Sequence, residues 1–155
     1  MTPAINTLKN KKISHNIHEY SHDKSSESYG LEAVEKMGVN VENVFKTLVV
    51  QIDNKLLAVG VLPVSSQLSM KLIAKALGAK KAMMADKSDV ERSTGYVLGG
   101  VSPMGQKIRL KTVIDASVKK LATVYVSAGR RGLEIELAPS DLVKLTHATV
   151  ADICL

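Results

Sequence analysis

Hydrophobic residues recur along the chain at two different spacings, and each spacing predicts a different kind of element. Ala4, Ile5 and Leu8 follow one another at helical spacing directly after Thr2-Pro3, an N-cap with proline in the first turn. The same spacing predicts further helices over 31–37 and 70–77, each followed by glycine, a helical turn from Asp86, and a helix from Pro139 to about Thr146.

Continuous apolar runs rich in β-branched residues predict strands. Residues 44–52 and 56–62 are two such runs joined by Asp53-Asn54-Lys55, which is typical of a β-hairpin and implies antiparallel pairing. Shorter strands are expected over 16–21, 81–84, 107–114, 123–127 and 133–137, with another near the C-terminus. Helices and strands are therefore mixed without strict alternation.

Residues 95–106 predict a structured loop. Gly95, Gly99, Gly100, Pro103 and Gly105 fall within eleven residues, which favours an irregular backbone. Flexible backbone N–H groups of this kind are suited to the wall of a pocket. Four apolar side chains are expected to anchor the loop: Val97, Leu98, Val101 and Met104.

The composition fits one globular domain spanning residues 1–155 and excludes several classes of protein. The chain is 45% hydrophobic, yet no apolar run approaches the roughly 18 residues of a membrane span. Polar residues close to the N-terminus argue against a signal peptide, and a single cysteine excludes a disulfide framework or a multi-cysteine zinc site. We expect a cytoplasmic protein that needs no metal or cofactor.

The positive charge is concentrated in one segment. The net charge is +6, and residues 99–131 carry all of this excess. Two interpretations remain open, a solvated face and a phosphate-binding surface. The alternation of Lys107, Arg109 and Lys111 with Ile108 and Leu110 favours the second, because on a strand it places the three cations on one face and the apolar pair in the core.

Two motifs suggest chemistry that their surroundings do not support. His18-Glu19-Tyr20-Ser21-His22 matches the H-E-x-x-H pattern of zinc proteases, which requires a helix. The flanking residues lack a helical stripe and no convincing third ligand follows, so we interpret this segment as a strand, on which the two histidines lie about 13 Å apart. Cys154 has no recognisable base or activating group near it in sequence and is interpreted as a packed terminal thiol.

Lys46 is unusual because it lies at the head of the most apolar strand, Val44-Phe45-Lys46-Thr47-Leu48. A charge at this position marks either a strand end that reaches solvent or a cation at the rim of a pocket. The glycine-rich loop supplies backbone groups that are suited to the same pocket.

Several segments together resemble the YbaK family of free-standing bacterial Cys-tRNA(Pro) deacylases, which is related to the editing domain of bacterial prolyl-tRNA synthetases. The resemblance runs almost end to end, and these segments carry it: Thr2-Pro3-Ala4, Phe45-Lys46-Thr47-Leu48, Ala85-Asp86, Ser93-Thr94-Gly95-Tyr96, Gly99-Gly100-Val101-Ser102-Pro103-Met104-Gly105-Gln106 and Tyr125-Val126-Ser127-Ala128-Gly129-Arg130-Arg131-Gly132-Leu133.

The resemblance implies an α/β (α+β) fold with a curved, mixed, barrel-like sheet flanked by helices, and the removal of cysteine from tRNA(Pro). It places the functional lysine at Lys46 and the family's G-x-x-x-P loop at Gly99–Pro103. The backbone N–H groups of Gly99, Gly100 and Val101 in this loop are suited to stabilising an oxyanion. The substrate pocket would contain Tyr20, Tyr29, Thr47, Pro103, Ser127, Gly129 and Glu134. The concentration of positive charge gives the candidate RNA-binding residues: Lys107, Arg109, Lys111, Arg130 and Arg131. Two departures, Ala128 where glycine is common and Glu134 where aspartate is common, bear on substrate preference.

The implied substrate accounts for the absence of an evident nucleophile. A cysteinyl ester carries its own thiol, so the protein has to fold the substrate and stabilise the developing oxyanion. Lys46 would then bind the terminal phosphate, the ribose or a thiolate. Two alternatives stay open: a non-catalytic module that binds the tRNA acceptor end or prolyl-tRNA synthetase, and a deacylase for another amino acid, such as alanine on tRNA(Pro).

Overall fold

The computed structural model describes residues 1–25 and 28–155. The helices in these residues are α1 (Pro3–Asn10), α2 (Tyr29–Met37), α3 (Met70–Ala76), α4 (Lys87–Thr94) and α5 (Pro139–Thr146), with short 3-10 helices at Val41–Asn43 and Ala116–Lys120. The strands are β1 (His15–Glu19), β2 (Phe45–Ile52), β3 (Leu56–Pro63), β4 (Ala82–Met84), β5 (Lys111–Asp115), β6 (Val124–Arg130), β7 (Leu133–Leu137) and β8 (Thr149–Ala151). Within the described residues, no helix is long and apolar enough to cross a membrane.

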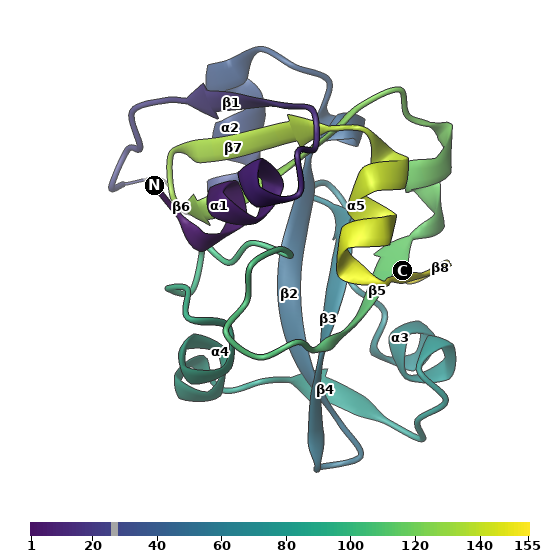
Figure 1. Ribbon diagram of the computed structural model, residues 1–155. Helices are drawn as coiled ribbons and strands as arrows, with labels where there is room; N and C mark the ends of the chain where they lie inside the picture. Colours follow the sequence, from purple (N-terminus) through teal and green to yellow (C-terminus); the bar gives the residue numbers. More distant parts are fainter. Residues whose placement is uncertain (26–27) are drawn as a thin grey trace.

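The strands form two sheets that meet at one point (Figure 1). The five-stranded sheet has the order β4-β2-β3-β5-β8 and is mixed, because β5 runs parallel to both of its neighbours. The three-stranded sheet, β1-β7-β6, is antiparallel. A parallel bridge between Val44 and Tyr125 joins them where β2 begins. The predicted α/β (α+β) fold with a mixed sheet and flanking helices is confirmed, although the strands form two linked sheets and not a closed barrel.

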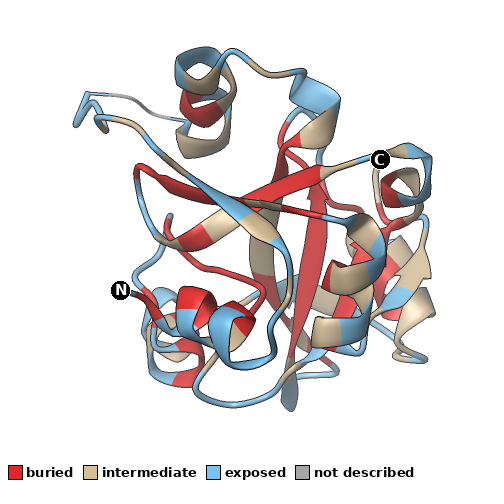
Figure 2. Cartoon of the chain, turned by 45° about the horizontal axis from the view of Figure 1, so that its top comes forward, coloured by how far each residue is buried: buried red, intermediate tan, exposed pale blue. Residues whose placement is uncertain are grey.

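The predicted hairpin of β2 and β3 forms the centre of the molecule. Asp53 and Asn54 have positive φ angles of 52° and 58° and close the turn. Alternate side chains of β2 enter different cores: Val49 packs in the cluster that includes helix α1, and Val50 packs in the cluster that includes Ile73 of α3. Figure 2 shows buried positions along most of the hairpin. The two faces of this hairpin therefore pack in two different core clusters.

The helix ends follow the predicted signals. The Thr2 side chain accepts a hydrogen bond from the Ile5 N–H, and Pro3 occupies the first turn of α1. Helix α2 ends at Gly38, which has a φ of 67°. Helices α3 and α5 also lie where the sequence predicts them.

The predicted strand over 107–114 is wrong in its first half. The N–H groups of Lys107 and Ile108 donate to carbonyl oxygens of Thr94 and Ser93, so this stretch follows the end of α4 and has no ladder partner. Strand β5 begins only at Lys111, opposite Ala58 of β3. Ile108 is 52% exposed, which overturns its predicted place in the core.

The loop over 95–106 is anchored by half of the predicted apolar residues. Val101 and Met104 are buried, and the Tyr96 hydroxyl donates to the Met104 carbonyl oxygen at 2.6 Å. Val97 and Leu98 are exposed, contrary to the prediction. Leu98 lines the cavity described next and does not pack on the core.

Candidate active site

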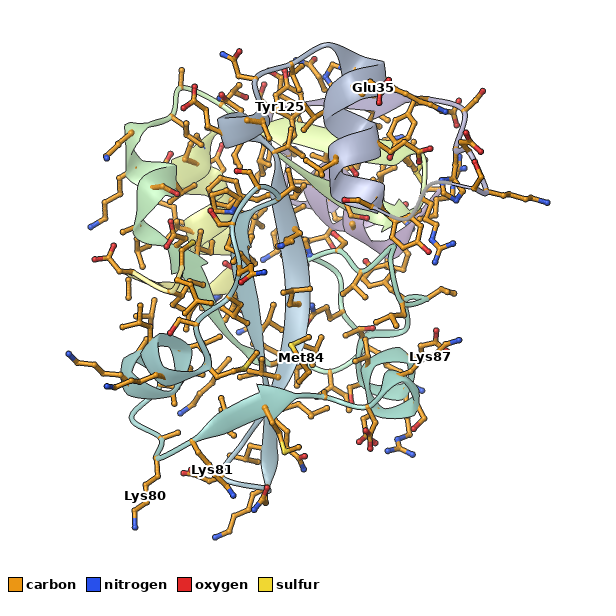
Figure 3. All side chains as sticks on the ribbon, turned by 180° about the vertical axis from the view of Figure 1, so that it is seen from behind. Glu35, Lys80, Lys81, Met84, Lys87 and Tyr125 are labelled. Atoms are coloured by element: carbon orange, nitrogen blue, oxygen red, sulfur yellow. The ribbon has the colours of Figure 1, made fainter. Side chains whose placement is uncertain are left out.

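A cavity of about 350 Å³ lies beside the open edge of β2. Strand β4 pairs only with Val50–Ile52, so the first half of β2 has no strand beside it on that edge within the described residues. In Figure 3, this edge lies between α2 above and α4 to the side, with Met84 below. The described residues that line the cavity come from α2, β2, the end of β4, the 95–106 loop and the three-stranded sheet.

Most of the residues predicted from the sequence meet in this cavity. They come from segments that are distant along the chain, and the structure brings together Tyr20, Tyr29, Lys46, Thr47, Gly99, Val101, Ser127, Arg130, Arg131 and Glu134. The apolar walls, which the sequence analysis missed, include Leu48, Val64, Met84 and Leu98. The only available signal for these was their hydrophobicity, which does not distinguish a pocket wall from a core.

Three of the predicted catalytic and substrate-binding residues lie outside the cavity. The Gly100 N–H donates to the Val97 carbonyl oxygen at 2.9 Å, so it is engaged within the loop. Pro103 lines a smaller cavity of about 180 Å³ that also contacts Arg109. Gly129 has a φ of 113°, and a Cβ there would lie 2.7 Å from Tyr96 Cε1, so this glycine serves close packing.

The oxyanion donors predicted in the loop are therefore reduced to two. Gly99 and Val101 line the cavity, and within the described part of the chain their N–H groups donate to no protein acceptor. Gly100 keeps a structural role, since a Cβ on it would lie 3.0 Å from the Arg130 Cα. The absence of a side chain at Gly100 thus lets the loop pack closely against β6. The residues on either side of it, Gly99 and Val101, line the cavity.

Lys46 lies at the rim of the cavity and is half-buried. It shares a face of β2 with Leu48 and Val50, which pack toward α3 and the C-terminal segment. Burial lowers the pKa of the Lys46 ammonium, and Cys154 is an electrostatic neighbour of this group. No carboxylate is paired with Lys46 among the described residues, which leaves its charge available to an anion.

Glu134 is the one acidic side chain among the described residues of the lining, and it is only 7% exposed. Its position on β7 is opposite Ser127 of β6 and His18 of β1. Burial raises the pKa of Glu134 to about 8. Burial and the nearby Glu134 and Glu32 raise the pKa of Tyr20 to about 12, so the phenol is neutral at ordinary pH.

Tyr29 and Arg131 close one side of the cavity. The Arg131 guanidinium carbon lies 3.7 Å from the centroid of the Tyr29 ring, and its Nη2 donates to the Leu98 carbonyl oxygen at 3.2 Å. The Tyr29 ring also makes an edge contact with the His22 ring, with 5.6 Å between the ring centroids. The stack therefore ties α2, the loop and the β6–β7 turn together at the mouth.

The other predicted RNA-binding residues do not join this site. Lys107, Arg109 and Lys111 are exposed and line no part of the larger cavity. Arg130 and Arg131 are exposed at its mouth, where Arg130 also pairs with Glu19 at 2.8 Å. The basic segment is therefore divided over two places, and only its last two members border the cavity.

The H-E-x-x-H segment is a strand only in its first half, because β1 ends at Glu19. His18 lies in β1 and pairs with Glu136 at 2.9 Å, and His22 follows the strand and pairs with Glu32 at 2.6 Å. Each histidine thus has its own carboxylate. Cys154 is half-buried at the C-terminus, and burial raises the pKa of its thiol, in keeping with a packed residue.

Comparison with known proteins places the chain in a family. The family model of the aminoacyl-tRNA editing domain matches residues 27–145. The chain is 35% identical over 153 residues to "Putative Cys-tRNA(Pro)/Cys-tRNA(Cys) deacylase EbsC" of Enterococcus faecalis, covering 98% of this chain and 92% of that protein. It is 28% identical over 124 residues to the uncharacterized protein YwhH of Bacillus subtilis, covering 79% and 78% of the two chains.

Solved structures show the same fold. The crystal structure of "a putative trans-editing enzyme for prolyl tRNA synthetase" has a TM-score of 0.83 at 21% identity, covering 100% of this chain and 99% of that one. The crystal structure of hypothetical protein APE2540 has a TM-score of 0.88 at 24% identity, covering 99% and 100%. Together with the family match, these relatives show that the chain belongs to the family of aminoacyl-tRNA editing domains, with the YbaK-type fold.

Proposed function

We propose that this protein is a trans-editing deacylase that removes cysteine from mischarged tRNA(Pro), acting in the cytoplasm and without a cofactor. Membership of the editing family supports an aminoacyl ester as the substrate class. The relative from Enterococcus faecalis bears a Cys-tRNA deacylase name, which supports cysteine as the amino acid. The observation that carries the proposal is the composition of the described part of the cavity, in which Lys46 has no carboxylate partner, the Gly99 and Val101 N–H groups have no protein acceptor and Ser127 has no histidine base.

Ser127 is not activated as a nucleophile by any residue of the described lining. The Ser127 Oγ donates to the Gly100 carbonyl oxygen at 3.2 Å and accepts from the Gly129 N–H at 3.1 Å. No histidine is among the described lining residues, so Ser127 has no base of the Ser–His kind. The substrate thiol therefore serves as the nucleophile in this proposal.

The reaction then needs no atom from the protein. The cysteinyl sulfur forms a bond to its own ester carbon, the bond from that carbon to the ribose oxygen breaks, and the thiol proton passes to the ribose oxygen. The products are a four-membered thiolactone and tRNA with a free terminal hydroxyl, and water then opens the thiolactone to cysteine. Holding the thiol against the carbonyl can contribute about 7–11 kcal/mol, and an oxyanion donor adds about 3 kcal/mol.

The protein supplies geometry and charge. Gly99 and Val101 N–H groups are the remaining candidates to stabilise the oxyanion, and Lys46 provides the cation for the terminal phosphate, the ribose or the thiolate. Arg130 and Arg131, at the mouth, bind the phosphates of the acceptor strand. A second partner in this proposal is prolyl-tRNA synthetase. The test is single-turnover deacylation of Cys-, Ala- and Ser-tRNA(Pro): cleavage of Cys-tRNA(Pro) above the other two supports the proposal, and preference for Ala-tRNA(Pro) reassigns the substrate.

A further inference from the structure

Glu134 is a buried carboxyl group that borders the cavity without a partner. Among the residues the structure describes, none donates a hydrogen bond to it or pairs with it. Glu136, two residues further along β7, shows the contrast: its carboxylate accepts from His18 at 2.9 Å and from Thr123 at 3.1 Å. Because a buried carboxylate is costly unless it is paired, an unpartnered one that borders a binding cavity indicates a ligand with a positive charge.

The cations of the cavity do not compensate Glu134. Arg130 pairs with Glu19, Arg131 stacks on Tyr29, and Lys46 has Cys154 as an electrostatic neighbour. Burial is the cause of the raised pKa of Glu134. The cavity is therefore polarised, with exposed cations at the mouth and a buried acid within.

Among the described residues, one fully buried side-chain oxygen of the same lining makes no hydrogen bond, the Thr47 Oγ1. An ammonium group carries three donors and no acceptor, so it suits a carboxylate and a hydroxyl oxygen together. A methyl group has no donor and a thiol has a single weak one, so neither would satisfy both oxygens.

We propose that Glu134 pairs with the α-ammonium of the aminoacyl group, so that the cavity selects esters with a free amino group and rejects N-acylated ones such as peptidyl esters. This inference rests on the proposed function for the substrate class. An aminoacyl ester of cysteine or alanine carries only one positive charge, the α-ammonium, while the phosphates of the acceptor end face the cations of the mouth. The pairing thus fixes which way the amino acid enters.

The pH dependence of binding follows from the same pair. The free carboxyl titrates near 8, and an α-amino group titrates near ~7.7–8.0, so the complex retains one proton shared between the two groups. Binding weakens at low pH, where Glu134 must lose a proton, and at high pH, where the amine has lost its own. Tyr20, in the segment after β1, faces Glu134 and stays neutral over the pH range in which Glu134 and the amine titrate. His18, opposite Glu134 on β1, is paired with Glu136.

The first test compares two ligands on the unmodified protein. The probes are 3′-amino-3′-deoxyadenosine acylated with cysteine or with 3-mercaptopropanoic acid, which keep the thiol and differ only in the amine. We expect calorimetry at pH 7.5 to give about 10- to 100-fold tighter binding of the cysteinyl compound, the value of a charge-assisted hydrogen bond in a buried site. Binding of the two within about threefold, or of neither, overturns the pairing.

The second test asks whether Glu134 is the residue that causes the preference for the amine. Glu134→Gln keeps the size and removes the charge, and we expect its preference for the amine to fall to within about threefold. Glu136→Gln, the same change two residues away and outside the cavity, is expected to keep the preference. Thermal unfolding shows that each variant is folded, and the ligand comparison above stands without any variant. A full preference in the Glu134→Gln protein overturns the assignment.

Single-turnover cleavage separates this inference from the proposed function. The wild type is given tRNA(Pro) esterified with cysteine, with N-acetylcysteine or with 3-mercaptopropanoic acid, all of which carry the attacking thiol. Rapid cleavage of the first alone supports both proposals. Equal cleavage of all three overturns the pairing and leaves the deacylase standing, whereas no cleavage of any, with the amine preference intact in binding, overturns the deacylase and leaves the pairing.

Discussion

The Arg131 guanidinium lies over the Tyr29 ring at 3.7 Å, and Gly99 packs against the edge of this stack. A Cβ on Gly99 would lie 2.7 Å from Tyr29 Cε2 and 2.8 Å from Arg131 Nη2. The φ of 92° adds to the demand for glycine. The mouth of the cavity is therefore sensitive to a single methyl group at this position.

Gly99→Ala should lower deacylation by about tenfold or more, because a displacement of roughly 1 Å in a positioned site is costly. It should also lower the free energy of unfolding by about 1–2 kcal/mol for the left-handed backbone. Gly78→Ala is the matched control: its φ is 69° and nothing lies within 4 Å of the added Cβ, so it carries the backbone cost alone. Equal activity losses in the two variants would contradict the role of the stack.

Lys46→Ala should abolish measurable deacylation while changing the free energy of unfolding by less than about 1 kcal/mol. The reason is that the Lys46 ammonium is half-buried, has a lowered pKa and pairs with no described carboxylate, so its loss removes charge from the site without breaking an ion pair. Single-turnover rates and thermal melts measure the two effects. Lys80→Ala, at the opposite end of the molecule from Tyr125 in Figure 3, is expected to leave both unchanged.

Local signals made most of the fold predictable, and tertiary contacts account for what was missed. The β2–β3 hairpin and the start of α1 depend on residues adjacent in sequence, such as Asp53-Asn54 and Thr2-Pro3. Lys107 and Ile108 alternate like a strand, but their N–H groups are taken by carbonyls at the end of α4. Alternation therefore predicts a strand only where a neighbouring strand has open groups to offer.

The candidate site, like the fold, could be predicted only in part from the sequence. The resemblance located Lys46 and Glu134, but neither the lack of a partner for Glu134 nor the engagement of the Gly100 N–H is visible in the sequence, because each depends on residues brought in by folding. The sequence shows the positive charge of Arg109 but not its position, which is beside the smaller cavity.

Stability should depend on pH through Glu134. Its pKa is 4.5 in an open chain and about 8 in the folded protein, so the native state holds the extra proton between these values. Stability therefore falls as pH rises from about 5 to 8 and levels off above, by at most about 5 kcal/mol. Denaturant unfolding of the wild type and Glu134→Gln across this range should show the decline only in the wild type. Parallel profiles would place the carboxyl in a more polar setting.

Binding of tRNA should weaken steeply with salt, and the mouth of the cavity should contribute. Each single-strand phosphate contact adds roughly −0.7 to the log–log slope, so neutralising Arg130 and Arg131 together should flatten it by about 1.4. Replacing Lys80 and Lys81 by glutamine is the control of equal charge. A variant neutralised at the three cations of 107–111 measures whether the body of the tRNA reaches that surface; contact with all three would flatten the slope by about 2.

The last prediction concerns the substrate thiol. Serine and cysteine are close in size, so a pocket of this kind separates their esters by only about 1–3 kcal/mol. Their chemistry separates them further, because a thiol with a pKa near ~8.5 is a few per cent ionised at pH 7 and an alkanol is not. Ser-tRNA(Pro) should therefore bind nearly as well as Cys-tRNA(Pro) and be cleaved at least ~100-fold more slowly, a loss of about 3 kcal/mol in transition-state stabilisation.

Alkylating the substrate thiol should stop the reaction in the same way, although the larger side chain also tests the fit of the cavity. Single-turnover rates at saturating protein separate the two effects, since binding no longer limits them. Comparable rates for the serine and cysteine esters would mean that an activated water attacks the carbonyl. The search for its base would then start at Glu134, whose pKa of about 8 leaves a fraction of the carboxylate ready to accept a proton near neutral pH, and at Tyr20 beside it.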